Sequence, residues 1–326
     1  MIDIEKVNAR VLSCQPIVKL FFQEMHKVIY GQDNLIRKLL LAFLTNGHVL
    51  LEGVPGLAKT KTAATFSQIL DLKFQRVQFT PDLLPGDIVG TQIYNPKSME
   101  FEVKKGPIFA NFILADEINR APAKVQSALL EAMQEKQVTI GDTTFELDLP
   151  FFVVATQNPL EQEGVYPLPE AQMDRFMFKI LVGYPDKREE KEIMKNHAFE
   201  KHVDLKQILD SNSVENIKQA IEKIYIDEKI EDYIVEIVSV TRDIKSVGLD
   251  SRLLSFGASP RAALNIYKAA KGNAFLEGRA YVVPQDVKDT AKEVLRHRIL
   301  LSYEAEAENI TSDTIIEEIL NKVPTP

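Results

Sequence analysis

The chain has 326 residues, 45% of them hydrophobic and 26% charged, so it can bury the cores of about two globular domains. Its net charge of −8 disfavours a general binder of nucleic acid or of anionic membranes, although a local basic patch could still bind either. A single cysteine, Cys14, excludes an internal disulfide and a cysteine-based zinc site. We find no signal peptide and no apolar run long enough to span a membrane, so we expect a cytoplasmic location.

Apolar residues at helical spacing predict two helices before the first strand, over residues 3–27 and 34–45. The link between these helices contains Gly31 and Gln32. It could line an adenine pocket or be a plain helix–helix turn, and the pattern alone favours neither interpretation.

Residues 49–70 have the pattern of a strand, a glycine-containing loop and a helix. The loop and the first helical residues are Gly53, Val54, Pro55, Gly56, Leu57, Ala58, Lys59, Thr60 and Lys61. The backbone N–H groups of such a loop and the helix N-terminus form a nest for phosphates. Lys59 would reach the β- and γ-phosphates of ATP, and the Thr60 hydroxyl would ligate Mg²⁺. Ala58 stands where glycine is usual; we expect it to be helical already, where a methyl group fits. The alternative is an ordinary strand-to-helix turn that contains a lysine.

Four more apolar runs predict strands over 74–79, 111–117, 151–156 and 176–182. With the strand at 49–51 they predict a parallel five-stranded sheet with helices on both faces. Helices are expected over 122–136 and 169–174, and residues 80–87 are expected to be irregular. Two hairpins should interrupt this order, one near 91–103 and one near 138–147 that turns at Gly141-Asp142.

From Lys187 onward the pattern is helical throughout. One helix should begin at Ser259-Pro260, another should span 285–298, and Ser312-Asp313 should cap the last. The sequence therefore predicts an α/β P-loop core over residues 1–186 and an all-α lid over 187–326.

Paired carboxylates, Asp116 and Glu117, end one of the apolar strands. A parallel sheet brings the ends of its strands to the edge where the phosphate loop lies. There Asp116 can hold Mg²⁺ and Glu117 can accept a proton from the attacking water. The alternative is the N-cap region of a helix.

Asn158 follows the strand expected between the two nucleotide-binding strands. Its amide could orient the lytic water or touch the γ-phosphate, a role that the neighbouring Gln157 could share. The alternative is an ordinary Asn-Pro turn.

Two arginines follow in the chain. Arg175 comes after a short helix, and this layout puts no phosphate of its own subunit nearby, so its functional interpretation is a role across a subunit interface. Arg261 lies in the first turn of a lid helix, where its charge opposes the helix dipole and indicates an anionic partner. A surface salt bridge is the alternative for either one. Arg296 and Arg298 are weaker candidates, because basic residues are favourable late in a helix.

Taken together, these residues resemble an AAA+ ATPase of the MoxR family. Six segments carry the resemblance, in order and over nearly the whole chain: residues 53–60, 79–85, 114–122, 155–164, 169–176 and 257–262. The likeness implies that Asp116-Glu117 is the Walker B motif, Asn158 sensor 1, Arg175 the arginine finger and Arg261 sensor 2. It also implies that the hairpins are the helix-2 insert and the pre-sensor-1 hairpin.

Proteins of this kind form ring hexamers with ATP at the subunit interfaces. They act as chaperone-like remodelling ATPases, often with a partner that bears a von Willebrand factor A domain. We therefore expect Mg-ATP hydrolysis that remodels or matures protein complexes. One alternative is a nucleic-acid motor or loader, for which Lys97, Lys104 and Lys105 against Glu100 and Glu102 make a poor electrostatic funnel. Another is a nucleotide-gated binding module with negligible turnover.

Overall fold

The computed structural model describes residues 4–160, 164–197 and 203–326. Its centre is a five-stranded parallel sheet in the order β2-β5-β8-β1-β9. The strands are β1 Val49–Glu52, β2 Phe74–Gln78, β5 Phe112–Asp116, β8 Phe152–Gln157 and β9 Phe178–Leu181. This confirms the predicted sheet. We call the edge where these strands begin the amino edge, and the edge where they end the carboxyl edge.

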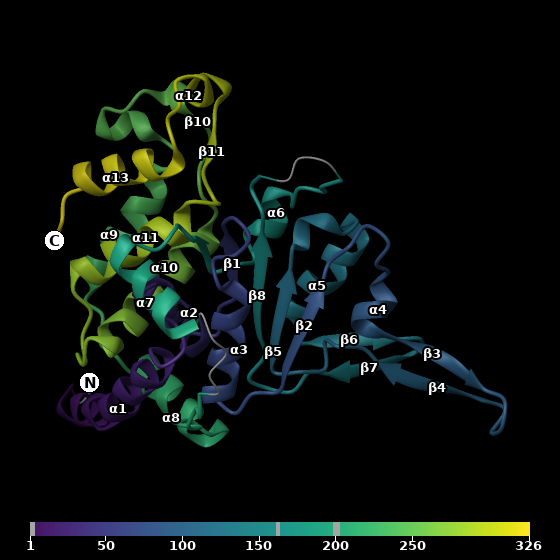
Figure 1. The fold of residues 1–326 in the computed structure, drawn as a ribbon. Coiled ribbons are helices and arrows are strands. Elements are labelled where there is room, and N and C mark those ends of the chain that lie inside the picture. The colour runs from purple at the N-terminus through teal and green to yellow at the C-terminus, as the bar shows by residue number, and fades with distance from the viewer. Residues whose placement is uncertain (1–3, 161–163, 198–202) are drawn as a thin grey trace.

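The apolar runs become strands because both faces of the sheet are covered. Alternate residues of β1 belong to different cores: Val49 and Leu51 face one side and Leu50 the other. In Figure 1 one side carries α1 Ile4–Met25, α2 Asp33–Leu44, α3 Lys59–Ile69 and the C-terminal helices, and the other carries α5 Ala123–Glu135. The predicted coverage of both faces is therefore present.

Phe66 of α3 fixes the helix that begins at the phosphate loop. Its ring lies 5.3–5.9 Å from those of Phe21, Phe43, Phe112 and Phe152. These rings come from α1, α2, β5 and β8, and each such pair adds roughly 0.5–1.5 kcal/mol beyond the area it buries. Helix α3 is thus held against the sheet from several directions.

Both predicted hairpins are present. The first pairs β3 Gly90–Asn95 with β4 Glu100–Lys105, and the second pairs β6 Gln137–Ile140 with β7 Thr143–Glu146. The first hairpin projects away from the body of the molecule in Figure 1. Just before it lies a short helix, α4 Pro85–Val89, which begins inside the segment expected to be irregular.

Among the residues described, the region after the sheet is helical, as predicted, apart from short pieces of β-structure. Its helices are α7 Lys187–His197, α8 Ser211–Glu222, α9 Glu228–Val240, α10 Pro260–Leu276, α11 Pro284–Leu295, α12 Tyr303–Ala307 and α13 Ser312–Lys322. This β-structure includes a two-stranded antiparallel ribbon of β10 Leu254–Phe256 and β11 Leu300–Leu301, and an isolated parallel bridge between Tyr225 and Tyr281. Ser259 caps α10 as expected, whereas Thr311, not Ser312, caps α13.

The lid and the sheet share one apolar core. Buried residues of β1, α2, α10 and α13 belong to a single contiguous cluster. The proposed boundary at residue 186 stays a prediction. No helix among the residues described is long and apolar enough to cross a membrane.

Candidate active site

The phosphate loop leaves β1 at the carboxyl edge and enters α3. Gly53 donates its amide to Gln157 O at 3.2 Å. A Cβ at Gly53 would lie 2.7 Å from Val182 O, so the chain needs glycine there. Gly56 has a φ of 87°, in the region that favours glycine. The loop, with Val54, Pro55 and Leu57, therefore takes a compact path that exposes its backbone towards a phosphate.

Ala58 does not have the helical conformation expected from the sequence. Its φ of 55° and ψ of 18° are left-handed, and it is the N-cap of α3 rather than its first residue. The expectation was wrong because the loop needs a left-handed residue to turn into the helix. The chain meets that need with an alanine, at a conformational cost.

Lys59 begins α3 and is partly buried. Its Nζ donates to Gly53 O, across the loop. Burial lowers the pKa of Lys59, and the negative charges of Asp116, Glu117 and Glu52 oppose that shift. The lysine therefore lies within electrostatic reach of the paired carboxylates. Thr60 and Lys61 follow it in the first turn.

Asp116 is the last residue of β5 and is 9% exposed. Its Oδ1 accepts the hydroxyl of Thr156 at 2.6 Å, and its Oδ2 accepts Nη2 and Nε of Arg76 at 2.6 and 3.0 Å. Sequence reasoning singled out neither partner. Thr156 could have been found from its place at the end of β8, beside β5.

Glu117 follows in the left-handed conformation, with φ 56°. Its Oε2 accepts Gln78 Nε2 at 2.8 Å and Arg120 Nη1 at 3.0 Å. Its amide donates to Thr156 Oγ1 at 2.9 Å. Two donors thus hold the carboxylate at the carboxyl edge, beside Asp116. Gln78 was also missed, although it ends β2 at that edge.

Asn158 directly follows β8, which pairs with both β5 and β1 as expected. It is buried, and its Oδ1 accepts the amide of Leu160 at 3.1 Å. Residues 161–163 of the same motif lie outside the residues that the structure describes.

Gln32 lines a cavity of about 90 Å³ beside the phosphate loop, whereas Gly31 is not among the described residues that line it. The cavity is lined by residues of the link, the phosphate loop, α3 and the segment after β9: Val28, Ile29, Tyr30, Gln32, Gly56, Leu57, Ala58, Lys61, Pro185 and Ile193. Gln32 Nε2 donates to Leu57 O at 3.1 Å. The link between α1 and α2 therefore lies next to the phosphate loop, and the adenine pocket stays a prediction.

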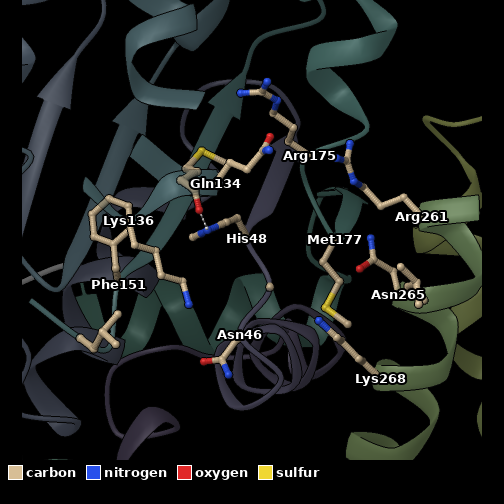
Figure 2. A pocket seen from close by; sticks show the side chains of 14 residues that line it. Asn46, His48, Gln134, Lys136, Phe151, Arg175, Met177, Arg261, Asn265 and Lys268 are labelled. Carbon is tan, nitrogen blue, oxygen red and sulfur yellow. Dashed lines mark hydrogen bonds between the residues drawn. The ribbon is translucent and has the colours of Figure 1, made fainter. Parts of the chain in front are cut away.

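Arg175 and Arg261 lie far from this loop, at the amino edge. Both line a cavity of about 290 Å³ beside His48, which directly precedes β1. Figure 2 shows Arg175, Arg261 and Lys268 along one side of this cavity and Lys136 across from them. The four cations meet no acidic side chain among the described residues that line it.

Arg261 is tied to the residue before Arg175. Its Nη1 donates to Asp174 Oδ2 at 3.0 Å, with Arg261 44% exposed. The salt bridge considered as an alternative for Arg261 is thus present. No hydrogen bond or ion pair of the Arg175 guanidinium is found within the described part of the chain.

The carboxyl edge offers a donor set that suits Mg²⁺ bound with a nucleotide. Magnesium prefers oxygen ligands and keeps several waters and substrate phosphates. The Thr60 hydroxyl and the Asp116 carboxylate are such ligands. Among the described residues no group of three or more His, Cys, Asp or Glu could hold a metal ion. These residues therefore fit a metal that arrives with phosphates better than a free-standing metal centre.

The phosphate loop after β1, the paired carboxylates at the end of β5 and the helical lid define a P-loop ATPase of the AAA class. Family models agree: residues 48–178 match "ATPase family associated with various cellular activities (AAA)", and residues 249–319 match "AAA lid domain".

Comparison with individual relatives identifies the family within this class. The chain is 49% identical to Chaperone MoxR1 of Mycobacterium tuberculosis over 93% of this chain and 81% of that protein. It is 31% identical to Protein MoxR of Methylorubrum extorquens over 94% of each. A solved structure from Cytophaga hutchinsonii is 51% identical and superposes with a TM-score of 0.93 over 100% of both chains. The chain belongs to the MoxR family of AAA ATPases.

Proposed function

We propose that this chain hydrolyses Mg-ATP at the interfaces of a ring oligomer and uses the cycle to remodel a protein client. The observation that carries the proposal is the division of the site between two edges of the sheet. The phosphate loop and both carboxylates lie at the carboxyl edge, whereas Arg175 and Arg261 lie at the amino edge. One chain cannot bring these groups to one nucleotide, but two chains packed edge to edge can.

Each group has a role in this scheme. The loop amides and Lys59 would bind the phosphates, and Thr60 and Asp116 would hold the metal, which supplies charge neutralisation when bound. Glu117 would accept the proton of the attacking water, which Asn158 would orient. Because Glu117 Oε2 is held by Gln78 and Arg120, turnover would require at least one of these contacts to exchange for water. Arg175 of the next subunit would neutralise charge on the transferring phosphoryl group.

The cavity beside the loop suits the base of the nucleotide. Its walls are largely apolar, and Gln32 and the loop backbone provide the polar groups. We propose that Gln32 contributes to an adenine site there and that the adjacent Gly31, with a φ of 70°, shapes the link that carries it.

The projecting hairpin favours a protein client over nucleic acid. Tyr94, Met99 and Phe101 are 50%, 76% and 68% exposed near its tip. Glu100 and Glu102 lie on the same strand as Lys104 and Lys105 and offset their charge. A phosphate backbone would meet little net attraction there. The likeness to Chaperone MoxR1 also supports a protein client; the family resemblance suggests a hexamer and a partner with a von Willebrand factor A domain.

A mixing experiment tests the division of the site. Lys59→Ala should lose phosphate binding, and Arg175→Ala should bind ATP but hydrolyse it about 10³–10⁵ times more slowly. In a mixed ring, some interfaces pair the intact loop of one variant with the intact arginine of the other. Part of the ATPase activity should return on mixing, and it should depend on total protein concentration. No recovery in mixtures shown by sizing to co-assemble would contradict a role of Arg175 across the interface.

A further inference from the structure

The segment Arg296–Arg298 of the lid packs against the connection that carries Arg175. This connection, residues 174–177, runs from α6 Glu170–Met173 to the start of β9 and is neither helix nor strand. Most of its carbonyls are therefore not held by regular secondary structure. They are held by side chains that directly follow α11.

Arg298 provides most of these contacts, and its side chain is 1% exposed. Its Nη2 donates to the carbonyls of Asp174 and Phe176 at 2.8 and 2.6 Å, and its Nη1 donates to Met177 O at 3.2 Å. One guanidinium thus holds the carbonyls on both sides of Arg175. Burial lowers the pKa of Arg298 to about 10, an effect that Asp174 opposes, so the cation persists at neutral pH.

The two residues before Arg298 make further contacts with backbone carbonyls nearby. The His297 Nε2 lies 3.0 Å from Phe176 O, and Arg296 Nη1 donates to Lys179 O at 2.6 Å. Asp313 of α13 holds the Arg296 guanidinium through both carboxylate oxygens, at 2.6 and 2.8 Å. The lid therefore holds the carbonyls of Asp174, Phe176 and Met177 in the connection, and that of Lys179 in β9.

Asp174 joins these contacts to the second arginine of the cavity. Its Oδ1 accepts Arg298 Nε at 2.7 Å, and its Oδ2 accepts Arg261 Nη1 and the Ser259 hydroxyl, both at 3.0 Å. The Asp174 carboxylate thus connects Arg298 with Arg261 and with Ser259, the N-cap of α10.

We propose that Arg298, acting through Asp174 and the carbonyls on either side of Arg175, is the residue that positions Arg175 and Arg261 for the ATP of the neighbouring subunit. The inference rests on the proposed role of Arg175 across the interface. It assigns a function to a residue that looked in the sequence like a favourable charge at a helix end. Lysine should not replace it, since an ammonium lacks the planar fork that reaches several carbonyls at once.

The experiment asks which subunit must contain Arg298. The parent mixture combines Lys59→Ala, which donates the arginines, with Arg175→Ala, which donates the phosphate loop. Arg298→Lys is then added either to the arginine donor or to the loop donor. In the arginine donor it should reduce the recovered kcat about tenfold to a hundredfold, because a misplacement of ~1 Å can cost that much. In the loop donor it should leave recovery close to that of the parent mixture, and the KM for ATP should stay unchanged in both.

Each result bears on a different claim. A loss confined to the arginine donor supports the positioning role. Equal loss in both arrangements, or loss in neither, overturns it while the role of Arg175 stands. No recovery in the parent mixture removes the proposed function itself.

Two further variants serve as a control for Arg298→Lys and as a second test of the proposal. Arg279→Lys removes another arginine fork from the lid, one that binds Asp286 at 2.6 and 2.8 Å near the other end of α11. In the arginine donor it should leave recovery near the parent level. If Arg298→Lys fails to fold, Asp174→Asn keeps the side-chain shape and should give the same one-sided loss. A symmetric effect of Asp174→Asn would overturn the proposal.

Discussion

Replacing Ala58 by glycine should make the chain more stable. Ala58 has φ 55° and ψ 18°, a left-handed conformation in which its Cβ crowds a backbone carbonyl at a cost of roughly 1–2 kcal/mol. Glycine removes that cost but gives the unfolded chain more conformational freedom, which is worth about 0.4–1 kcal/mol. The net gain in the free energy of unfolding should be about 0.5–1 kcal/mol.

Urea denaturation without nucleotide measures this difference directly, because bound nucleotide would add its own stabilisation. The midpoint for Ala58→Gly should rise with an unchanged slope. Ala64→Gly is the matched control, since Ala64 lies inside α3 and should lose about 0.8–1 kcal/mol. If both variants lost stability to the same extent, the left-handed strain at Ala58 would be refuted.

Three further results are expected. Mg-ATP at about 100 times its Kd should stabilise the chain by about 2.7 kcal/mol in thermal melts, and Lys59→Ala should abolish this gain; an equal shift in the variant would exclude the assigned phosphate role. Glu117→Gln should still bind ATP but lose about 10²–10⁴ in steady-state turnover, and near-normal turnover would point to another base. Stability to urea should fall as the pH drops from about 6.5 towards 4, because burial lowers the pKa of His48 to about 4 and the unfolded chain takes up the proton first. His48→Gln should weaken this pH dependence, and an unaltered pH dependence would argue against His48.

The sheet was predictable because its signals are local. Phe152, Val153 and Val154 form a continuous apolar run of the kind that a doubly covered parallel strand requires. The phosphate loop was equally clear, since its glycines stand between a strand and a helix. The turn at Gly141 is visible in the same way, from residues that are adjacent in the chain.

What the sequence could not reveal depends on residues distant in the chain. In the sequence, Arg298 looked like a favourable charge at a helix end. Its proposed role depends on hydrogen bonds to carbonyls of residues 174–177, which lie more than a hundred positions earlier in the chain. The conformation of Ala58 was missed because helix propensity says nothing about the turn that the loop must make. The ribbon of β10 and β11 was missed because its two short strands lie in a region with helical periodicity.

The close contact between α2 and α10 restricts how the molecule can move. A Cβ on Gly272 would lie 2.4 Å from Leu41 Cδ1, so the two helices approach as closely as glycine permits. Nearby, Lys38 of α2 and Glu293 of α11 form an ion pair at 3.1 Å with both side chains largely buried. Removing one partner of such a buried pair costs roughly 3–5 kcal/mol, because the other charge is left uncompensated. A hinge that moved α10 and α11 away from α2 would have to break both contacts. In the ring proposed above, we therefore expect α2 and these lid helices of one chain to move together.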